Sequence, residues 1–474
     1  MEKQHIYSKI INQYLHENKL KKPVCKAPFI SMSIGMTGFV SPCCYTQSFF
    51  AESDIISKYP DHSLMEIWRG KGFKKFRKNL NRSWFPEECQ ICESDLANGN
   101  FKSAKMRMYE GYKKHKKYPV MLEMAIDNTC NLECVMCNSQ LSSKIASHKG
   151  VKYDNGFNHE QFKAELQPII PHLQECIFSG GESFLSKTYR DIWRDIIRVN
   201  PDCRISVNTN GTVLNDEIKA LMEAGIFFLN VSIDSVNKTT YEQIRKGASF
   251  EQVMENLSYF LDYSKRKNTI LSMPVCPLTL NYKELPDIVE FCNSRGIFLE
   301  FVHVFNALNV NLQYAKKEVL EEAYGICSDA QFVVRDQASE HNVNMLKALS
   351  EKIRFWIREK EFRESFLSEI TLDGNSFIKA MQDFETKIKN YLYATYDRNE
   401  AETRYIKWKQ KKDDLFKQLP DYLHAAIFYR PMFEIKTSVW YQYVSTMPLD
   451  ELKVLIQSFG ERVISDVGSS ENYN

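Results

Sequence analysis

Three cysteines on one short segment constrain this chain more than any other feature. Cys130, Cys134 and Cys137 have the spacing C-x3-C-x2-C and follow directly after an apolar run typical of a strand. Three thiolates on a tight loop can hold three irons of a [4Fe–4S] cube, which leaves the fourth iron open to a small molecule. A structural zinc site normally has a fourth ligand nearby, and none is adjacent here. The segment therefore predicts an iron–sulfur loop.

Residues 120–305 alternate short apolar runs with helical patterns, which is typical of consecutive βα units around a parallel sheet. The helical pattern is clear in 215–224, where Ile218, Leu221 and Met222 recur at helical spacing and Gly225 ends the run. The six predicted strands are Val120–Ile126, Cys176–Ser179, Ile205–Asn208, Phe227–Ile233, Ile270–Val275 and Ile297–Val304.

Two regions of different character flank these units. Residues before 120 are rich in turns and cysteines, with Cys25, Cys43 and Cys44 followed by the C-x2-C pair Cys89 and Cys92. These soft ligands suit a small metal-stapled module. After residue 306, few prolines or glycines interrupt a charged and aromatic stretch, which we expect to be mostly helical.

Overall charge and apolar content narrow the class of protein. A net charge of +2 gives no global field for nucleic acid or an anionic membrane. The basic stretches Lys71–Arg82 and Lys113–Lys117 are expected to be solvated helix faces, and no basic patch interleaved with aromatics supports nucleic-acid modification. No apolar targeting segment follows Met1, and no run of about 18 apolar residues occurs. We therefore expect a cytoplasmic chain whose 13 cysteines are metal ligands or buried thiols.

The cysteine loop resembles the signature of the radical S-adenosylmethionine (SAM) superfamily, in which C-x3-C-x2-C follows the first strand of a partial (βα)6 barrel. At the end of the second predicted strand, Gly180, Gly181 and Glu182 are similar to the family's glycine–glycine–glutamate element. The resemblance implies that they hold the SAM ammonium, and glycine suits close backbone approach to a ligand. Asn208, at the third strand end, is similar to the family's polar strand end.

Further strand-end residues fit the same resemblance. Ser232 and Asp234 close the fourth predicted strand, and Arg245 follows on the next helix. The family implies that Ser232 and Arg245 contact the SAM carboxylate and ribose, that Asp234 belongs to the same cofactor site, and that Val275 lies near adenine. Met136 stands where an aromatic residue is common, and a flexible thioether can fill that space. Each residue alone is explained as well by a strand-end cap or surface ion pair, but all fall where such barrels place their chemistry.

The N-terminal cysteines look like the auxiliary-cluster module called Twitch or SPASM-like, which follows the barrel in many relatives and precedes it here. The resemblance implies an auxiliary [4Fe–4S] cluster on Cys25, Cys43, Cys89 and Cys92, with Cys44 as the alternative to Cys43. Four thiolates also suit zinc, and unligated buried thiols are a third interpretation. Spacing alone does not separate iron from zinc.

The remaining cysteines lie in apolar or isolated contexts and are predicted to be core thiols. They are Cys176, Cys203, Cys276, Cys292 and Cys327. Among them, Cys276 lies at a strand end facing the expected site, where a thiol could relay a hydrogen atom.

These observations predict an α/β chain with a Twitch/SPASM-like module over 1–118, a partial (βα)6 TIM-type barrel over 119–305 and a helical extension over 306–474. By resemblance, it binds a [4Fe–4S] cluster, SAM and a second [4Fe–4S] cluster. The resemblance also implies a 5′-deoxyadenosyl radical that abstracts hydrogen from a peptide, a protein or a small-molecule natural product. A cellular flavodoxin or ferredoxin is the expected reductant. The alternative is a non-catalytic iron–sulfur or zinc protein that carries electrons or serves as a scaffold.

Overall fold

The computed structural model describes most of the chain and divides into two compact units. The described residues are 11, 13–17, 22–47, 57–86, 89, 92, 96, 105–151, 157–302, 304, 307, 310–369, 374–418, 441, 444–445, 449 and 452. One unit comprises Met1–Asn311 with Asp329–Leu349, and the other comprises Leu312–Ser328 with Ser350–Asn474. The module boundaries expected from the sequence, at 118/119 and 305/306, remain predictions.

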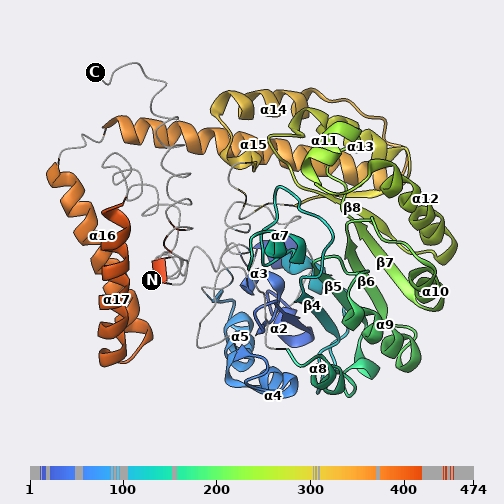
Figure 1. Cartoon of the computed structure of the whole chain (residues 1–474), viewed down its shortest axis with the longest axis horizontal. Helices are drawn as coiled ribbons and strands as arrows, with labels where there is room; N and C mark the ends of the chain where they lie inside the picture. The colour runs from blue at the N-terminus through green and yellow to red at the C-terminus, as the bar shows by residue number, and fades with distance from the viewer. Residues whose placement is uncertain are drawn as a thin grey trace. The chain divides into compact units, whose positions relative to one another are not determined.

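A nine-stranded sheet forms the centre of the first unit, in the order β3-β2-β1-β4-β5-β6-β7-β8-β9. Its strands β4 to β8 are labelled in Figure 1. From β4 onward the strands run parallel in chain order, as consecutive βα units require. They are β4 Met121–Asp127, β5 Glu175–Gly180, β6 Arg204–Thr209, β7 Ile226–Val231, β8 Leu271–Val275 and β9 Phe298–Phe301. All six predicted strands are present, and the open sheet confirms an α/β fold with a partial barrel.

The N-terminal region extends this same sheet. β1 (Ser31–Ile34) pairs in parallel with β4, and Ser33 lies opposite Glu123. β2 (Phe39–Ser41) and β3 (Ser57–Lys58) continue the sheet in antiparallel pairs. The short helical elements of this region are α2 Ala27–Ile30, α3 Cys44–Gln47, α4 Leu64–Arg69, α5 Lys71–Asn81 and the 3-10 helix η2 Lys105–Tyr109. The region that carries the N-terminal cysteines therefore lies at one edge of the sheet whose strand β4 leads into the cysteine loop.

Helices pack on the outer face of the parallel strands. α9 (Lys187–Val199) buries Trp193, whose ring packs edge-on against Phe178 and Phe227 at centroid distances of 5.5 and 5.4 Å. Burying a large apolar side chain stabilises the fold by roughly 1.5–3 kcal/mol. Further helices are α7 Ser143–His148, α8 His159–Leu166, α10 Asp216–Ala224, α11 Lys238–Ile244, α12 Phe250–Lys267 and α13 Leu285–Asn293.

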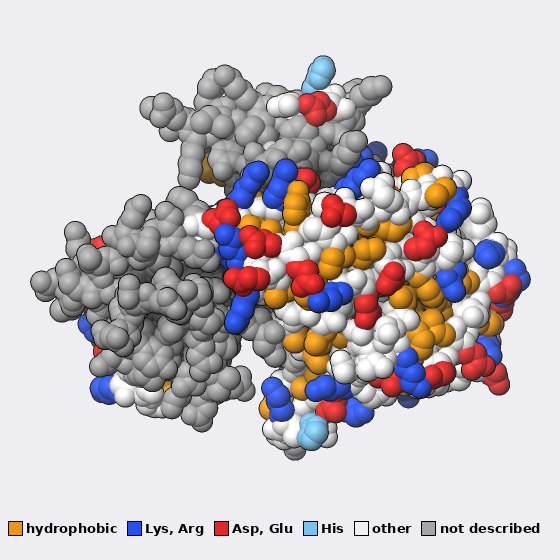
Figure 2. All heavy atoms as spheres, turned by 90° about the horizontal axis from the view of Figure 1, so that it is seen from above, with side chains coloured by type: hydrophobic (Ala, Val, Ile, Leu, Met, Phe, Trp, Pro, Cys, Tyr) orange, Lys and Arg blue, Asp and Glu red, His pale blue; other side chains and the backbone are white. Residues whose placement is uncertain are grey.

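Many charged side chains on these outer helices are paired with opposite charges. Arg266 on α12 contacts Glu223 at 2.8 Å and Asp262 at 2.7 Å, and Lys238 on α11 pairs with Glu251. On the face seen in Figure 2, basic and acidic side chains are interspersed among hydrophobic ones. Exposed pairs of this kind contribute little to stability, about 0–1 kcal/mol each. Because many of the basic side chains are paired with acidic ones, these helices do not present a surface potential of a single sign.

The described part of the second unit is helical, as predicted for residues after 306. Its elements are α14 Lys317–Asp329, the later part of α15 Gln337–Glu369, α16 Gly374–Thr395 and α17 Arg398–Phe416. α16 and α17 bury Ile388, Leu392 and Trp408 between them and neighbouring segments. Among the described residues, no helix is both long and apolar enough to cross a membrane.

Candidate functional site

The loop after β4 is fixed to the end of α11. The amides of Glu133 and Val135 donate to the carbonyls of Lys246 and Ile244, both at 2.9 Å. The cysteine segment belongs to no helix or strand, so these bonds give its backbone amides the partners that regular secondary structure would otherwise supply. The fourth βα unit therefore sets the position of the three cysteines.

Hydrogen-bond donors surround Cys130. The amide of Leu132 approaches Cys130 Sγ at 3.5 Å, and Asn210 Nδ2 at the end of β6 lies 4.0 Å from the same sulfur. The Cys130 amide itself donates to Ser143 Oγ at 3.0 Å. Donors near a sulfur favour the thiolate, which is the form that binds metal. Burial acts in the other direction and leaves the pKa of the free Cys130 thiol raised.

Cys134 and Cys137 lie beside a buried ion pair. Arg245 Nε donates to Asp234 Oδ2 at 2.6 Å, and these side chains are 11% and 0% exposed. The other Asp234 oxygen accepts from the Cys276 amide at 2.7 Å. A hydrogen bond from Cys134 lowers the pKa of Cys137, and the positive charge of Arg245 lowers it further against the effect of burial. A fixed cation is thus held next to two of the three sulfurs.

Gly180 and Gly181 bring the end of β5 against the backbone that leads into the cysteine loop. Gly180 has φ +122°, and a Cβ at this position would lie 2.4 Å from the Asp127 carbonyl oxygen. A Cβ on Gly181 would lie 2.3 Å from the carbonyl oxygen of Thr129. Both distances are far inside contact, so only glycine fits. Packing of the chain on itself explains both glycines, and their contact with SAM stays a prediction.

The carboxylate of Glu182 links the ends of β5 and β6. It accepts from Thr209 Oγ1 at 2.7 Å and from the amides of Asn210 and Phe184 at 2.6 and 3.0 Å. Burial raises the pKa of Glu182, and these hydrogen bonds oppose the rise. Because a carboxylate offers about four acceptor positions, three donors leave one for an ammonium. The SAM contact of Glu182 remains a prediction.

Polar side chains form a ladder on the inner face of the sheet. Asn230 Nδ2 donates to Asn208 Oδ1 at 2.8 Å, and the Ser272 hydroxyl donates to Asn230. Ser232 lies two residues beyond Asn230 and so shares its face, and the Ser232 amide donates to Thr209 at 2.9 Å. Asn208 and Ser232 are therefore brought to the same side of the sheet at neighbouring strand ends.

Val275 lies at the end of β8 with its side chain buried. Leu271 and Met273 are buried as well, whereas Ser272 and Pro274 between them are partly exposed. Side chains alternate along a strand, so the Val275 side chain points to the helix-covered face. The contact of Val275 with adenine stays a prediction.

The five cysteines predicted to be core thiols separate into two groups. Cys276 is partly exposed at the end of β8, whereas four are buried as predicted. The buried ones are Cys176, Cys203, Cys292 and Cys327.

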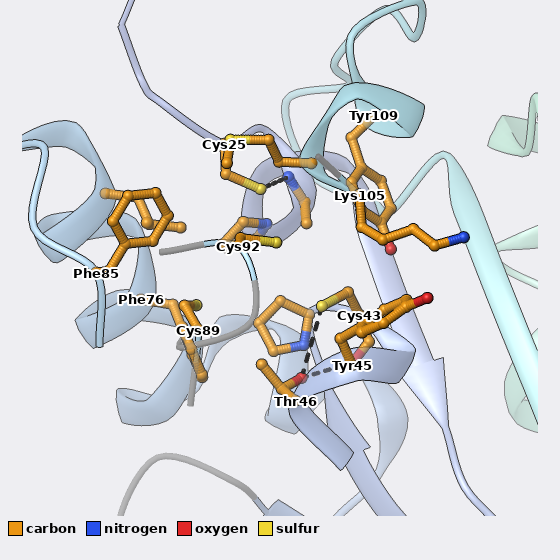
Figure 3. Close-up of a pocket in the computed structure, with 15 residues that line it drawn as sticks. Cys25, Cys43, Tyr45, Thr46, Phe76, Phe85, Cys89, Cys92, Lys105 and Tyr109 are labelled. Carbon is orange, nitrogen blue, oxygen red and sulfur yellow. Dashed lines mark hydrogen bonds between the residues drawn. The ribbon is translucent and has the colours of Figure 1, made fainter. Parts of the chain in front are cut away.

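Cys25, Cys43, Cys89 and Cys92 line one pocket in the N-terminal region (Figure 3). Its walls are largely apolar and come from α2, α5 and the segments around them. These wall residues include Ala27, Pro28, Pro42, Phe76, Leu80, Phe85 and Met106. The structure thus brings together the four cysteines selected by resemblance. Cys44 is not among the lining residues, and its amide donates to Glu123 Oε2 at 3.2 Å.

This pocket disfavours the charged thiolate form of a cysteine that has no metal bound. Burial raises the pKa of Cys43 to about 11, and it also raises the pKa of Cys25. Few polar groups oppose this effect: the Ala27 amide donates to Cys25 Sγ at 3.4 Å, and the Thr46 hydroxyl lies 3.8 Å from Cys43 Sγ. A bound metal reverses the preference, because coordination removes the thiol proton.

Glu123 is a buried carboxylate that the sequence interpretation missed. Tyr109, which also lines the pocket, donates its hydroxyl to Glu123 Oε1 at 2.5 Å. Burial raises the pKa of Glu123, and hydrogen bonds from Tyr109, Cys44 and Ser31 oppose the rise. The available signal was one acidic residue inside the apolar run 120–126.

Both sets of cysteines fit iron–sulfur groups by their donor chemistry. Three thiols on one loop match a cube with one open iron, and four thiols around one pocket supply a full set of ligands. In the part of the chain that the structure describes, no three histidine, cysteine or carboxylate side chains converge at the spacing of a single metal ion.

Family models match the same two regions. The model described as the radical SAM superfamily matches residues 124–292, and the model described as an iron–sulfur cluster-binding domain, SPASM, matches residues 25–93. The chain therefore contains a domain of the radical SAM superfamily of enzymes. The SPASM domain precedes this radical SAM domain, as the sequence predicted. A radical SAM domain binds a [4Fe–4S] cluster and SAM, and a SPASM domain implies additional iron–sulfur clusters.

Individual relatives match over part of their length. GTP 3′,8-cyclase of Synechococcus elongatus is 30% identical over 209 residues, which are 42% of this chain and 59% of that protein. The enzyme of the same name from Aliarcobacter butzleri is 25% identical over 191 residues, 39% of this chain and 56% of that protein. The chain thus spans less than two thirds of these relatives.

Two solved structures are also similar to this chain. Native anSMEcpe with bound AdoMet has 16% identity and a TM-score of 0.35, covering 44% of this chain and 59% of that chain. SuiB of Streptococcus suis bound to S-adenosylmethionine has 12% identity and a TM-score of 0.34, covering 64% and 68%.

Proposed function

We propose that this chain cleaves SAM reductively, with Cys130, Cys134 and Cys137 holding the cluster that SAM chelates. When bound, that cluster supplies the electron that breaks the C5′–S bond, and the 5′-deoxyadenosyl radical then takes a hydrogen atom from a substrate. One observation carries the proposal: three thiols lie on a loop tied to α11, with Arg245 held beside two of them.

The surrounding residues bind and orient SAM in this proposal. Asp234 fixes the Arg245 guanidinium, which then presents a positive charge to the SAM carboxylate without losing further side-chain freedom. The remaining acceptor position of Glu182 takes the SAM ammonium. Asn208 and Ser232 offer polar groups to the ribose from the inner face of the sheet.

The four pocket cysteines hold a second iron–sulfur group, which when bound exchanges single electrons and so permits a net two-electron oxidation, such as a cross-link or a dehydrogenation. The apolar walls formed by Phe76, Leu80 and Phe85 keep water away from the thiolates. Cys25, Cys43, Cys89 and Cys92 supply a complete ligand set, so this site needs no ligand from a substrate.

We infer a polar substrate, such as a peptide or protein side chain or a natural product. Support comes from the inner face of the sheet, which carries partly exposed Ser179, Asn208, Asn230, Ser272 and Glu300. GTP is the second candidate, because the curated relatives are named GTP 3′,8-cyclase. The test is to add GTP and SAM to the reduced enzyme. If GTP is consumed while 5′-deoxyadenosine forms, GTP is the favoured substrate. If GTP remains intact, a peptide, protein side chain or natural product is favoured.

The decisive experiment measures 5′-deoxyadenosine after anaerobic reconstitution with iron and sulfide and reduction with dithionite. We expect the product from the parent and none above background from a Cys130→Ala/Cys134→Ala/Cys137→Ala variant. A parent that carries its clusters and still makes no 5′-deoxyadenosine is instead a non-catalytic electron carrier or scaffold.

A further inference from the structure

A basic depression lies on the surface of the N-terminal region. Its lining residues come from α2, α4, α5 and the segment before β4, so the two basic stretches that stand out in the sequence meet there. The residues of this basic depression are Phe29, Trp68, Arg69, Arg77, Lys114, His115, Lys116 and Lys117. Trp68 Nε1 donates to the Lys117 carbonyl at 3.1 Å and joins α4 to the second of these stretches.

Only one of the two basic stretches is the solvated helix face expected from the sequence. Lys71–Asn81 is helical as predicted, with its lysines on the exposed side. Residues 113–117 are not helical, so their lysines are presented from an extended connection. That connection folds back onto α4, which a pattern of charges along the sequence does not show.

Positive charge in the basic depression is not neutralised by the described residues. Arg69, Lys114, Lys116 and Lys117 are exposed, and none of them forms an ion pair within the part of the chain that the structure describes. Lys114 lies 4.9 Å from the ring centroid of Phe29, a cation–π contact that keeps the full charge. Arg266 on α12, with two carboxylate partners, shows the opposite arrangement.

The basic depression and the cysteine pocket share their walls. On α5, Phe76 and Leu80 line the pocket, whereas Arg77 between them lines the depression. On α2, Pro28 lines the pocket and its neighbour Phe29 lines the depression. Arg77 Nε donates to the Pro28 carbonyl at 2.7 Å and holds the two helices together. A molecule seated in the depression is separated from the pocket by a single layer of chain.

We propose that the basic depression docks an acidic ferredoxin-type electron carrier. This inference rests on the proposed function, because reductive cleavage of SAM requires single electrons from outside. Opposite charges steer such a carrier and raise its rate of association. One electron leaves the reduced carrier and enters the iron–sulfur group held by the pocket cysteines, while no bond forms and no proton moves. The shared wall puts the docked carrier next to its redox partner.

Binding of an oxidised plant-type [2Fe–2S] ferredoxin to the anaerobically purified protein tests the proposal. The variant Arg69→Glu/Lys116→Glu reverses two charges in the basic depression. The matched control Lys265→Glu/Lys347→Glu reverses two exposed lysines on α12 and α15 and has the same net charge. We expect Kd to rise about tenfold or more in the first variant and to stay within about twofold in the control at low salt. Raising the salt concentration from about 50 to about 300 mM should weaken ferredoxin binding by the parent and leave binding by the first variant almost unchanged.

A second readout is the rate at which reduced ferredoxin is oxidised on mixing, which should fall in parallel with binding. Equal binding by the parent and the first variant overturns the proposal, and so does an equal loss in the control. The docking proposal is also overturned if the first variant loses affinity for a single-stranded oligonucleotide but still binds ferredoxin like the parent. That result would identify the depression as a nucleic-acid surface. Formation of 5′-deoxyadenosine with dithionite needs no docked protein, so its absence in the parent refutes the proposed function separately from the docking surface.

Discussion

The two groups of cysteines are built in opposite ways. Cys130, Cys134 and Cys137 share one loop, which backbone hydrogen bonds attach to α11 and which polar side chains and a buried Arg245 surround. The pocket cysteines are spread from residue 25 to residue 92 and are enclosed largely by apolar walls. One site is organised locally by the backbone, and the other is organised by the packing of distant segments.

This difference matches what each site holds in the proposed function. A site with one open iron must also hold the charged ends of SAM, so fixed donors and a cation beside the sulfurs are useful. A site with four thiolates needs no further ligand, and an apolar enclosure tunes its group by excluding water.

The largest effect is expected from removing cysteines in pairs. Cys134→Ala/Cys137→Ala should lower dithionite-driven formation of 5′-deoxyadenosine to below about a thousandth of the parent rate, because the radical chemistry belongs to the cofactor held there. Cys89→Ala/Cys92→Ala should leave this cleavage within about tenfold of the parent while preventing net substrate oxidation. Chromatography of the quenched reactions measures both. Equal loss in the two variants would mean that the two sites do not act separately.

Arg245→Met tests the polar character of the loop. The change leaves the Asp234 carboxylate buried without its cation, and breaking such a pair costs about 3–5 kcal/mol in the free energy of unfolding. Arg266→Met on α12 is the control, since its exposed pairs are worth about 0–1 kcal/mol. Urea unfolding followed by circular dichroism compares the two variants. Similar midpoints for both would show that the buried pair does not organise the loop.

Gly181→Ala tests the backbone contact that supports the loop. A Cβ 2.3 Å from the Thr129 carbonyl oxygen must displace the backbone just before Cys130, at a cost of about 1–3 kcal/mol. Gly325→Ala on α14 meets no atom within 4 Å and should stabilise its helix by about 0.5–1 kcal/mol. Thermal unfolding measures the two changes, and a Gly181→Ala variant as stable as the parent contradicts the close packing.

Cys44→Ser is expected to have the smallest effect. Cys44 does not line the pocket, and a hydroxyl can replace its thiol as a donor to Glu123, so stability should change by less than about 0.5 kcal/mol. Iron content should stay at the parent value. Cys43→Ser, at the neighbouring position inside the pocket, should lower it. If Cys44→Ser loses iron and Cys43→Ser does not, the assignment of the two cysteines is reversed.

Local patterns in the sequence were sufficient for the barrel strands and for the cysteine loop. The run 120–126 and its counterparts alternate with helical segments, and the spacing of Cys130, Cys134 and Cys137 is itself local. The parallel pairing of β1 with β4 could not be predicted, because it joins segments separated by a long connection. A separate N-terminal module was a natural expectation from its composition, whereas the sheet is continuous across that region.

Candidate site residues were selected from the sequence because they lie at strand ends. The roles of Glu182 and Asp234 in binding SAM stay predictions, and their hydrogen-bond partners Thr209 and Cys276 depend on tertiary geometry. For Val275, the apolar run located the strand, whereas the face on which its side chain is buried came from the structure. The basic depression shows the same limit on the surface, because two stretches far apart in sequence make it only after folding.

Iron, sulfide and zinc analysis of the anaerobically purified protein decides whether the chain holds two separate iron–sulfur sites. The parent should hold about eight irons and about eight sulfides, and the Cys130→Ala/Cys134→Ala/Cys137→Ala variant should hold about four of each. A Cys25→Ala/Cys43→Ala/Cys89→Ala/Cys92→Ala variant should also hold about four of each. A parent with about four irons and one zinc, in which the zinc is lost only from the second variant, would show that the pocket cysteines hold zinc and that there is one iron–sulfur site.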